Sequence, residues 1–290
     1  MNILEYENYQ EKISHGDPLF PYITYLCSIP LDFPCVPLHW HDEMEIVYIK
    51  KGKGKVTVDF KQYTVEEGTI ALILPGQLHS IEQFEDASME YENIIFHPNI
   101  LISKKTDTCN SDFFQPLLAG NVYLPQLLTP DLPFYTEIAA CVDANDEICK
   151  TKPAGYQLFI KSQLFLLFYL LFHKYSKKNV PGKDLKSLEK MKQILKYIEN
   201  HYMEKITIAD IAQEVGLSSS HFMKYFKNIM GTSFIEYLNE YRLTMASRLL
   251  VSSDSSILAI ASEVGFDNLS YFNRSFKKRF GQTPREYRKQ

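Results

Sequence analysis

Apolar and polar positions alternate in short runs through the first third of the chain. Between about residues 21 and 96 these runs are rich in β-branched and aromatic side chains and are bounded by turn residues. They cover residues 22–26, 45–49, 55–60, 63–65, 69–74 and 91–96. Gly52, Gly54, Gly68 and the Pro75-Gly76 pair separate them at the spacing of an all-β barrel or sandwich. The pattern predicts one β-barrel at about residues 15–100.

After Pro133 the apolar positions recur at helical spacing. Residues 134–148 form one candidate helix, and residues 156–175 form a second, very apolar one. The strongest apolar run of the second helix, 164–172, is shorter than the roughly 20 residues that cross a bilayer, so we expect a buried helix and no membrane partner. This helix either packs against the barrel or forms part of a dimer interface.

The C-terminal region contains a degenerate repeat with a period of about 50 residues. The segment IADIAQEVGL, which starts at Ile208, matches ILAIASEVGF, which starts at Ile257. Further matches follow with one inserted residue: Phe222, Phe226-Lys227, Gly231 and Glu236-Tyr237 correspond to Phe272, Phe276-Lys277, Gly281 and Glu286-Tyr287. Two copies of one supersecondary unit are therefore expected.

Each copy has the signals of a helix, a tight turn and a second helix. Thr207 and Ser256 stand at N-cap positions, and Gly216 and Gly265 stand where a positive-φ residue ends the first helix. The second helix would begin after Ser218 or Asp267 as its N-cap. The pattern predicts helix-turn-helix units at about 206–228 and 256–279, with a connecting helix at 234–250.

The second helix of each unit is amphipathic. Phe222, Phe226, Phe272 and Phe276 recur four residues apart and should face the core. The opposite face carries Ser219, Ser220, Met223, Lys224 and Lys227 in the first unit, and Asn268, Ser270, Asn273, Arg274, Lys277 and Lys278 in the second. Arg274 suits a bidentate contact to guanine and Asn273 one to adenine, and the lysines suit phosphates. A single such face could be merely solvated, but two copies favour binding to double-stranded DNA.

The charge distribution agrees with a nucleic-acid partner for the C-terminal part alone. The 290 residues, 45% hydrophobic and 23% charged, are typical of a soluble protein of two domains, with a net charge of −4. From Lys183 onward, 17 basic and 12 acidic side chains give a net charge of +5, which leaves −9 for the rest. The start of the chain lacks the pattern of a secretory signal, and the five scattered cysteines suit reduced thiols, so we expect a cytoplasmic protein.

The residues of both repeats closely resemble the AraC/XylS family of transcriptional regulators. The resemblance is carried by the two repeat segments and by a long second signature that includes Tyr271-Phe272, Phe276-Lys277-Lys278, Phe280-Gly281 and Thr283-Pro284-Arg285-Glu286-Tyr287-Arg288. It implies base-reading roles for Ser220, Met223 and Lys224, and for Ser270, Asn273 and Arg274. Met223 departs from the longer polar residue frequent at its position. The resemblance also implies a homodimer that binds a promoter or operator and contacts RNA polymerase.

A second constellation resembles the two motifs of the cupin barrel. His39-Trp40-His41, Glu45 and Gly52 fit the first motif, whereas Gly68, Pro75-Gly76 and His79 fit the second more loosely, with Gln83 in place of the usual asparagine. By strand parity, His39, His41 and Glu45 can point into the barrel, and His79 arrives from a later strand. These four residues could bind a divalent transition metal, could hydrogen-bond an organic ligand, or could be purely structural. We place the effector near His39, His41, Glu45, Tyr48 and His79, although strand alternation puts Tyr48 on the opposite face from Glu45.

Together these patterns predict an α+β multidomain fold, with a cupin or jelly-roll-like β-barrel, following helices and an all-α tandem helix-turn-helix domain. The predicted parts are an effector-binding and dimerisation domain at 1–175, with its helices at about 131–175, a linker at 176–187 and a DNA-binding domain at 188–290. The predicted function is that of a regulator, not an enzyme: an effector-responsive activator of genes for the use of a sugar or another small metabolite. The alternatives are a metal-dependent cupin enzyme with an appended DNA-binding module, and a ligand-independent regulator whose barrel only dimerises.

Overall fold

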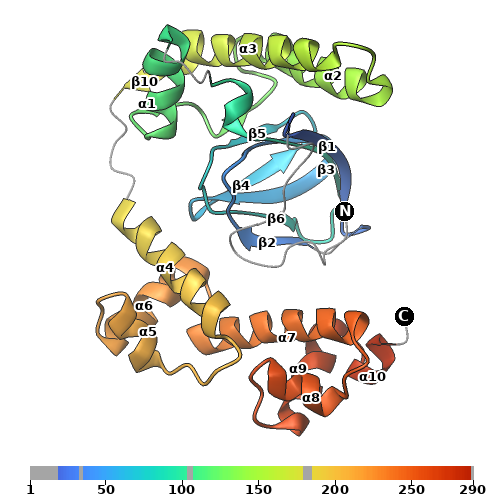
Figure 1. Ribbon diagram of the computed structural model, residues 1–290, viewed down its shortest axis with the longest axis vertical. Coiled ribbons are helices and arrows are strands. Elements are labelled where there is room, and N and C mark those ends of the chain that lie inside the picture. The colour runs from blue at the N-terminus through green and yellow to red at the C-terminus, as the bar shows by residue number, and fades with distance from the viewer. Residues whose placement is uncertain (1–18, 33–34, 103–106, 179–184, 289–290) are drawn as a thin grey trace. The chain divides into compact units, whose positions relative to one another are not determined.

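The computed structural model describes residues 19–32, 35–102, 107–178 and 185–288. The chain forms two compact units, Met1–Lys183 and Asp184–Gln290, which Figure 1 draws with their helices and strands labelled. The first unit contains the strands and the second is helical, as the sequence predicts. Within the described ranges, every helix is too short or too polar to span a bilayer.

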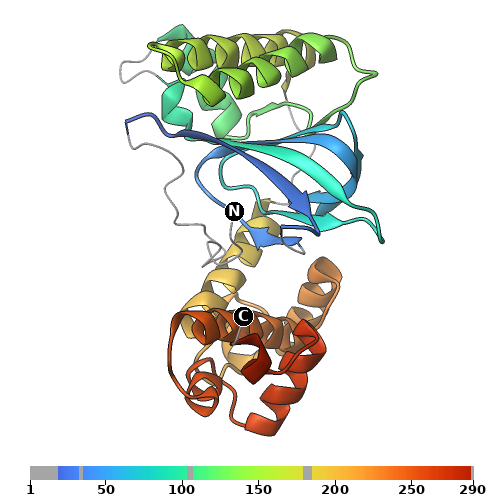
Figure 2. The same ribbon diagram turned by 90° about the vertical axis from the view of Figure 1, so that its right-hand side faces the viewer.

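Antiparallel strands form the body of the first unit. The strands are β1 (Tyr22–Ile29), β2 (Cys35–His39), β3 (Met44–Val58), β4 (Lys61–Glu66), β5 (Ile70–Ile73), β6 (His79–Gln83), β7 (Met89–Phe96), β8 (Val122–Tyr123), β9 (Leu127–Leu128) and β10 (Lys177–Lys178). The first part of β3 pairs with β7 and β5, and its second part pairs with β4 and β6. Because its two parts pair with different strands, β3 bends the sheet around an enclosed core (Figure 2).

The prediction of two separate runs at 45–49 and 55–60 is wrong, because β3 continues through both. A register shift between Ile49 and Lys51 and a φ of +78° at Gly52 bend the strand without ending it. A Cβ at Gly52 would lie 2.0 Å from the carbonyl oxygen of Ser88, so only glycine permits this close approach. The strands β2 and β6 were not among the predicted runs, although they carry two of the candidate histidines.

The helices of the first unit cover one face of the sheet, as both views show (Figures 1 and 2). They are α1 (Gln115–Leu118), α2 (Tyr135–Thr151) and α3 (Tyr156–Tyr175), with a 3₁₀ turn at Pro98–Ile100 and a π-helical turn at Asn110–Phe114. The predicted helix at 156–175 is confirmed, and the one predicted at 134–148 runs slightly further. Residues 179–184 of the predicted linker at 176–187 lie outside the described residues. Its described ends belong to β10 and to the first turn of the next helix.

Alternation along β3 divides the core of this unit in two. Met44 and Ile46 pack toward the helices, together with Ile138 of α2 and Leu164 of α3. Val47 and Ile49 instead join the interior of the barrel. Successive side chains of a strand point to opposite faces, so one strand contributes to both cores.

Seven helices of the described residues build the second unit. They are α4 (Leu185–His201), α5 (Ile208–Glu214), α6 (Ser219–Met230), α7 (Phe234–Ser252), α8 (Ile257–Glu263), α9 (Leu269–Phe280) and α10 (Pro284–Tyr287). The long helix α7 joins the group α5–α6 to the group α8–α9 (Figure 1). The prediction of a connecting helix is confirmed, and it extends two residues beyond the predicted end.

Candidate nucleic-acid interface and histidine cluster

The first helix-turn-helix unit is defined by local hydrogen bonds. The Thr207 hydroxyl accepts from the Asp210 amide at 3.2 Å, and the Asp210 carboxylate accepts from the Thr207 amide at 3.1 Å, which closes a capping box before α5. Gly216, with a φ of +64°, ends this helix. The Ser218 hydroxyl then accepts from the His221 amide at 3.3 Å and begins α6. The predicted caps of this unit are confirmed.

The second unit repeats this geometry with one difference. The Ser256 hydroxyl accepts from the Ala259 amide at 3.1 Å, and Gly265 has a φ of +87°. The N-cap of α9 is Asn268, whose Oδ1 accepts from the Tyr271 amide at 2.9 Å, so the prediction of Asp267 as this cap is wrong. The cap uses Oδ1 of Asn268, so the amide NH₂ group of this side chain takes no part in it.

The two second helices, α6 and α9, have a buried aromatic face and an exposed polar face. Phe222, Phe226, Phe272 and Phe276 are buried completely, as predicted. Every side chain expected to face DNA is exposed except Asn273, which is half-buried: Ser219, Ser220, Met223, Lys224, Lys227, Asn268, Ser270, Arg274, Lys277 and Lys278. The structure therefore leaves the polar face of each helix accessible to a nucleic-acid partner.

Helix α7 holds the two helix-turn-helix units in one rigid group. Its N-terminal end packs on α6, where the rings of Phe226 and Phe234 lie 5.5 Å apart. Its C-terminal part contributes Leu243 to the core that contains Phe272. An ion pair of 2.7 Å between Glu240 and Arg279 adds a contact with α9. The spacing of the two exposed faces is thus fixed by packing within this unit.

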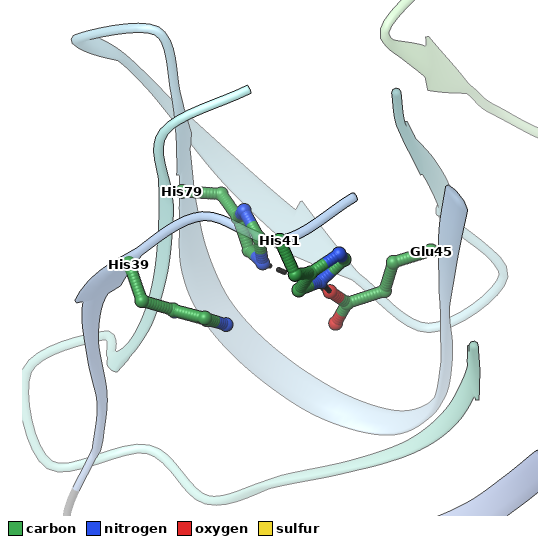
Figure 3. Close-up of side chains that lie close together, drawn as sticks. All are labelled: His39, His41, Glu45 and His79. Carbon is green, nitrogen blue, oxygen red and sulfur yellow. Dashed lines mark hydrogen bonds and ion pairs between the residues drawn. The ribbon is translucent and has the colours of Figure 1, made fainter. Parts of the chain in front are cut away.

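Four predicted side chains meet inside the barrel of the first unit. His39 ends β2, His41 follows it, Glu45 belongs to β3 and His79 begins β6. Figure 3 shows these side chains directed toward one another, and one potential ligand atom from each lies within 4.8 Å of the others. All four are buried, with at most 2% of each residue exposed.

The backbone orients all three imidazole rings. Nδ1 of His39 lies 2.9 Å from the Pro37 carbonyl oxygen, that of His41 lies 3.1 Å from the Glu43 carbonyl oxygen, and that of His79 lies 2.9 Å from the Gln77 carbonyl oxygen. A carbonyl oxygen only accepts, so each Nδ1 carries the hydrogen. In a neutral ring, Nε2 then presents a lone pair.

Two of these Nε2 atoms approach the same carboxylate oxygen. Oε2 of Glu45 lies 2.9 Å from Nε2 of His41 and 2.8 Å from Nε2 of His79. Lone pairs on both nitrogens would repel this oxygen, so a proton held between these groups or a metal cation would stabilise the arrangement. Three imidazoles and one carboxylate are a donor set typical of first-row transition metals.

Burial acts on the acid and on the bases of this cluster in opposite ways. Burial lowers the pKa of His39 well below its usual value, and the neighbouring His79 and His41 lower it further. Burial alone would raise the pKa of Glu45, but the imidazoles of His79 and His41 hold it well below the ordinary value. A neutral His39 and an ionised Glu45 are the states in which these groups bind a metal.

Two family models match the chain, one in each unit. Residues 32–144 match the AraC-like ligand binding domain, and residues 211–290 match a helix-turn-helix domain. The chain belongs to the AraC family of transcriptional regulators.

Two relatives of this AraC-family chain cover most of its length. It is 29% identical to the uncharacterized HTH-type transcriptional regulator YdeC of Bacillus subtilis, over 98% of this chain and 97% of that one. It is 25% identical to the HTH-type transcriptional activator RhaS of Citrobacter koseri, over 87% of each chain. Among solved structures, a transcriptional regulator with an AraC-type DNA-binding domain from Chromobacterium violaceum is 32% identical, covers 37% of this chain and 95% of its own, and has a TM-score of 0.35.

Tyr48 does not belong to the histidine cluster of this AraC-family protein. It shares its strand with Glu45 but has the opposite parity, and its ring packs with the core beneath the helices. The ammonium group of Lys50 lies 3.7 Å from the centre of the ring. The structure therefore separates Tyr48 from the four residues with which it was grouped, for the parity reason already visible in the sequence, and its contact with an effector stays a prediction.

Sequence reasoning missed the backbone groups that orient the cluster and a second set of polar residues. The carbonyl groups of Pro37, Glu43 and Gln77 leave no side-chain signal in a sequence. The second set includes Lys50 and Glu92, which lie on the helix-covered face of the sheet and form an ion pair of 3.0 Å. Lys50 and Glu92 each stand at a strand position where the alternation predicts a buried side chain. A charged residue at such a position was the signal that could have revealed them.

Proposed function

We propose that this AraC-family regulator reads an operator through the exposed faces of α6 and α9, and that a small molecule bound in the barrel alters its occupancy of that operator. The observation that carries the proposal is the pair of equivalent polar helix faces, each backed by two completely buried phenylalanines and joined by α7. Helices presented in this way suit successive segments of the major groove. Where their spacing differs from one turn of straight DNA, the DNA bends.

Within these faces we assign different tasks to different side chains. Arg274 and Asn273 contact base edges through their planar hydrogen-bonding groups, and Met223 contacts an apolar group such as a thymine methyl. Lys227, Lys277 and Lys278 contact phosphates, which adds affinity for any sequence. Ser219, Ser220, Lys224, Asn268 and Ser270 complete the two faces. Their exposure in the structure supports these roles.

Sequencing of genomic fragments retained by the purified full-length protein tests the DNA function. We expect enrichment of a few promoter regions that share a motif, and a binding constant that falls linearly on a logarithmic scale as salt increases. Retention without a shared motif, or binding that salt leaves unchanged, would contradict the proposal. The genes beside the enriched fragments would identify the class of effector.

We further propose that a divalent transition metal binds His39, His41, His79 and Glu45. The support is the geometry of the four donors, the backbone contacts that leave each Nε2 directed at the cluster, and the shared carboxylate oxygen. Such a metal would supply open coordination positions for an oxygen-bearing effector, for example a carbohydrate. An organic ligand that uses the same side chains only as hydrogen-bonding groups is the competing interpretation.

Metal analysis of the purified protein, followed by titration of the chelated protein with Zn²⁺, Mn²⁺ and Fe²⁺, separates these interpretations. We expect about one equivalent of metal per chain and a higher melting temperature when it is bound. A chain that neither retains nor is stabilised by any of these ions would leave the organic-ligand interpretation. A turnover screen would bear on the enzyme alternative, which the regulator relatives do not favour.

Helix α3 supports a proposal for the dimer. One side of it is buried, whereas Leu158, Phe165, Leu166 and Tyr169 are exposed by 75, 40, 44 and 59% along the other. Leu158, Phe165 and Tyr169 are seven and four residues apart, so they lie on one side of the helix with Leu166 beside them, and we propose that this apolar stripe is the dimer surface. In sedimentation velocity, the double variant Leu158→Glu and Tyr169→Glu should be monomeric, whereas Lys174→Glu should sediment like the original protein. Equal sedimentation of all three would contradict the assignment.

The direction of regulation is proposed by analogy with the relative that is named a transcriptional activator. We propose that the chain acts in the cytoplasm, contacts RNA polymerase and increases transcription when the effector is present. Transcription in vitro from an enriched promoter, with and without the effector, tests this. A decrease in transcript would identify a repressor.

A further inference from the structure

A buried amide of the barrel, outside the histidine cluster, lacks a hydrogen-bond partner. Asn93 stands in β7, and only 1% of the residue is exposed. Its amide oxygen Oδ1 is buried and has no hydrogen-bond partner among the residues that the structure describes. Buried polar groups are nearly always paired, so a buried amide oxygen without a donor indicates a missing partner.

The register of the strands places Asn93 on the interior face of the barrel, next to the histidine cluster. Asn93 pairs directly with Val47 of β3, which belongs to the interior core, and Tyr91 of β7 belongs to the same core. Glu45 lies two residues before Val47 on the same face of β3, so it is a diagonal neighbour of Asn93. Diagonal neighbours of an antiparallel pair are about 7 to 8 Å apart. One small molecule can therefore contact both Asn93 and the cluster.

The charge of Glu45 acts across this part of the interior. Cys27 stands on β1, on the other side of β7, and pairs there with Tyr91. Burial is the main reason that the pKa of the Cys27 thiol is raised to about 11, and the charge of Glu45 contributes in the same direction. The interior face of β7 thus lies close to the cluster and in surroundings of low polarity, where an unpaired acceptor is costly.

The surroundings of Asn93 favour a neutral donor as the missing partner. An amide oxygen only accepts, so the partner donates. Asn93, Val47 and Tyr91 carry no charge, so an ammonium group placed beside them would lose its hydration without a counter-charge in contact. A hydroxyl group loses less on burial, and one hydrogen bond to Oδ1 compensates that loss. Oxygen atoms also suit the imidazoles and the carboxylate of the cluster, so a ligand with several hydroxyl groups satisfies both places.

We propose that Asn93 determines the specificity of the sensor unit: its amide oxygen accepts from one hydroxyl group of a neutral, polyhydroxylated effector whose other hydroxyl groups contact the histidine cluster. The proposal rests on the proposed binding of the effector in the barrel, and it adds the residue that recognises one hydroxyl group of that effector. A site built to bond a hydroxyl group rejects the analogue that lacks it, because a buried acceptor is then left unpaired.

The melting temperature of the ligand-free protein gives a first test, which does not depend on the identity of the effector. Asn93→Leu replaces the unpaired amide with an apolar side chain of similar size. We expect the melting temperature of the dialysed full-length protein to rise by about 2 °C or more. An asparagine with a purely structural role would stabilise the fold, and its replacement would lower the melting temperature. An unchanged or lower melting temperature would therefore overturn the proposal.

Titration calorimetry with neutral sugars tests the class of ligand. The probes are the aldopentoses and aldohexoses, followed by the monodeoxy analogues of the sugar that binds most tightly. We expect Asn93→Leu to weaken the binding of that sugar at least about tenfold, and one monodeoxy analogue to bind the original protein as weakly. That analogue should lose no further affinity in Asn93→Leu, because the hydrogen bond is already absent.

Two further variants separate the hydrogen bond from other effects of the substitution. Asn93→Asp keeps an acceptor oxygen and nearly the same volume, so it should recover binding that Asn93→Leu loses. Asn145→Leu is the matched control, because Asn145 is 2% exposed but belongs to α2, outside the barrel, and it should leave sugar binding unchanged.

Two results of the titrations would overturn the assignment of Asn93. One is the same loss in Asn93→Leu for the sugar and for every monodeoxy analogue. The other is no binding of any sugar up to ~10 mM. A barrel that binds a metal but none of the sugars would leave the proposed metal site intact and would overturn only the role of Asn93.

Discussion

The guanidinium group of Arg242, in α7, donates from Nε to the carbonyl oxygen of Tyr202 at 2.7 Å. A second bond of 2.7 Å runs from Nη2 to the Glu204 carbonyl oxygen. The chain that leaves α4 is thereby attached to the middle of α7. Gly265, in the turn of the second helix-turn-helix unit, lies directly against this contact: a Cβ there would be 2.6 Å from the Tyr202 carbonyl oxygen and 2.9 Å from Nε of Arg242. One arginine thus connects α4, α7 and the turn before α9.

This contact predicts different effects for two equivalent glycines. Both Gly216→Ala and Gly265→Ala place a Cβ at a positive φ, which costs about 1 to 2 kcal/mol of unfolding free energy. At Gly216 the added carbon meets nothing within 4 Å, whereas at Gly265 it overlaps Tyr202 and Arg242. We expect Gly265→Ala to lose about 1 to 3 kcal/mol more. Chemical denaturation measures the unfolding free energy of both variants. Equal losses would show that the turn moves away from α7 without cost.

The division of tasks on α9 predicts two different losses of DNA affinity. Arg274→Ala should cost about 1 to 3 kcal/mol on the operator and relax the preference at one base pair. Lys277→Ala should weaken operator and random DNA alike and reduce the slope of binding against salt by about one unit. Fluorescence anisotropy over a salt series, on both kinds of DNA, gives these quantities. If the two variants behaved identically on both, the assignment of Arg274 to base reading would be wrong.

Removal of metal should change the melting temperature of a Tyr48 variant but not that of variants in the histidine cluster. Chelation should lower the melting temperature of the original protein and of Tyr48→Phe, because a ligand that binds only the folded chain stabilises it. It should have no effect on Glu45→Gln or His79→Ala, which lack one of the donors. Glu45→Gln nearly preserves the side-chain volume, so it serves where His79→Ala is poorly folded. A chelator that acted on all four proteins equally would contradict the site.

Glu92 predicts a stability that changes with pH. Its pKa is about 7 in the folded chain against an ordinary 4.5, so the folded state binds this proton more tightly than the unfolded state. The stabilisation is fully present below about pH 4.5 and is lost as pH rises through about 7, by about 3 kcal/mol in all. Glu92→Gln should remove this dependence, whereas Glu90→Gln, on the same strand, should retain it. Denaturation at several pH values between 4.5 and 7.5 tests this, and parallel profiles for the original protein and Glu92→Gln would contradict it.

Features that depend on near neighbours in the chain were predictable. The caps at Thr207, Ser218 and Ser256 form hydrogen bonds to amides three residues away, so short segments contain both partners. The cap of α9 was misplaced by one residue, because Asp267 and Asn268 are both favoured at that position and the choice depends on where the turn ends. The parity of β3 predicted that Glu45 points inward, and the same rule separates Tyr48 from it.

The sequence by itself determined the two units, the helix-turn-helix repeats and the four side chains of the histidine cluster. Only the tertiary structure decided that β3 is one strand, which pairs with β7 and β5 along its first part and with β4 and β6 along its second. It also decided that three carbonyl groups orient the imidazoles and that Glu92 meets Lys50, Thr24 and Asp146. Thr24 and Glu92 are 68 positions apart, and Lys50 and Asp143 are 93 apart. Helical caps and periodicity result from forces within one or two turns. Contacts across a sheet depend on strand register and on which helix covers which face, and these are set by packing of the whole chain.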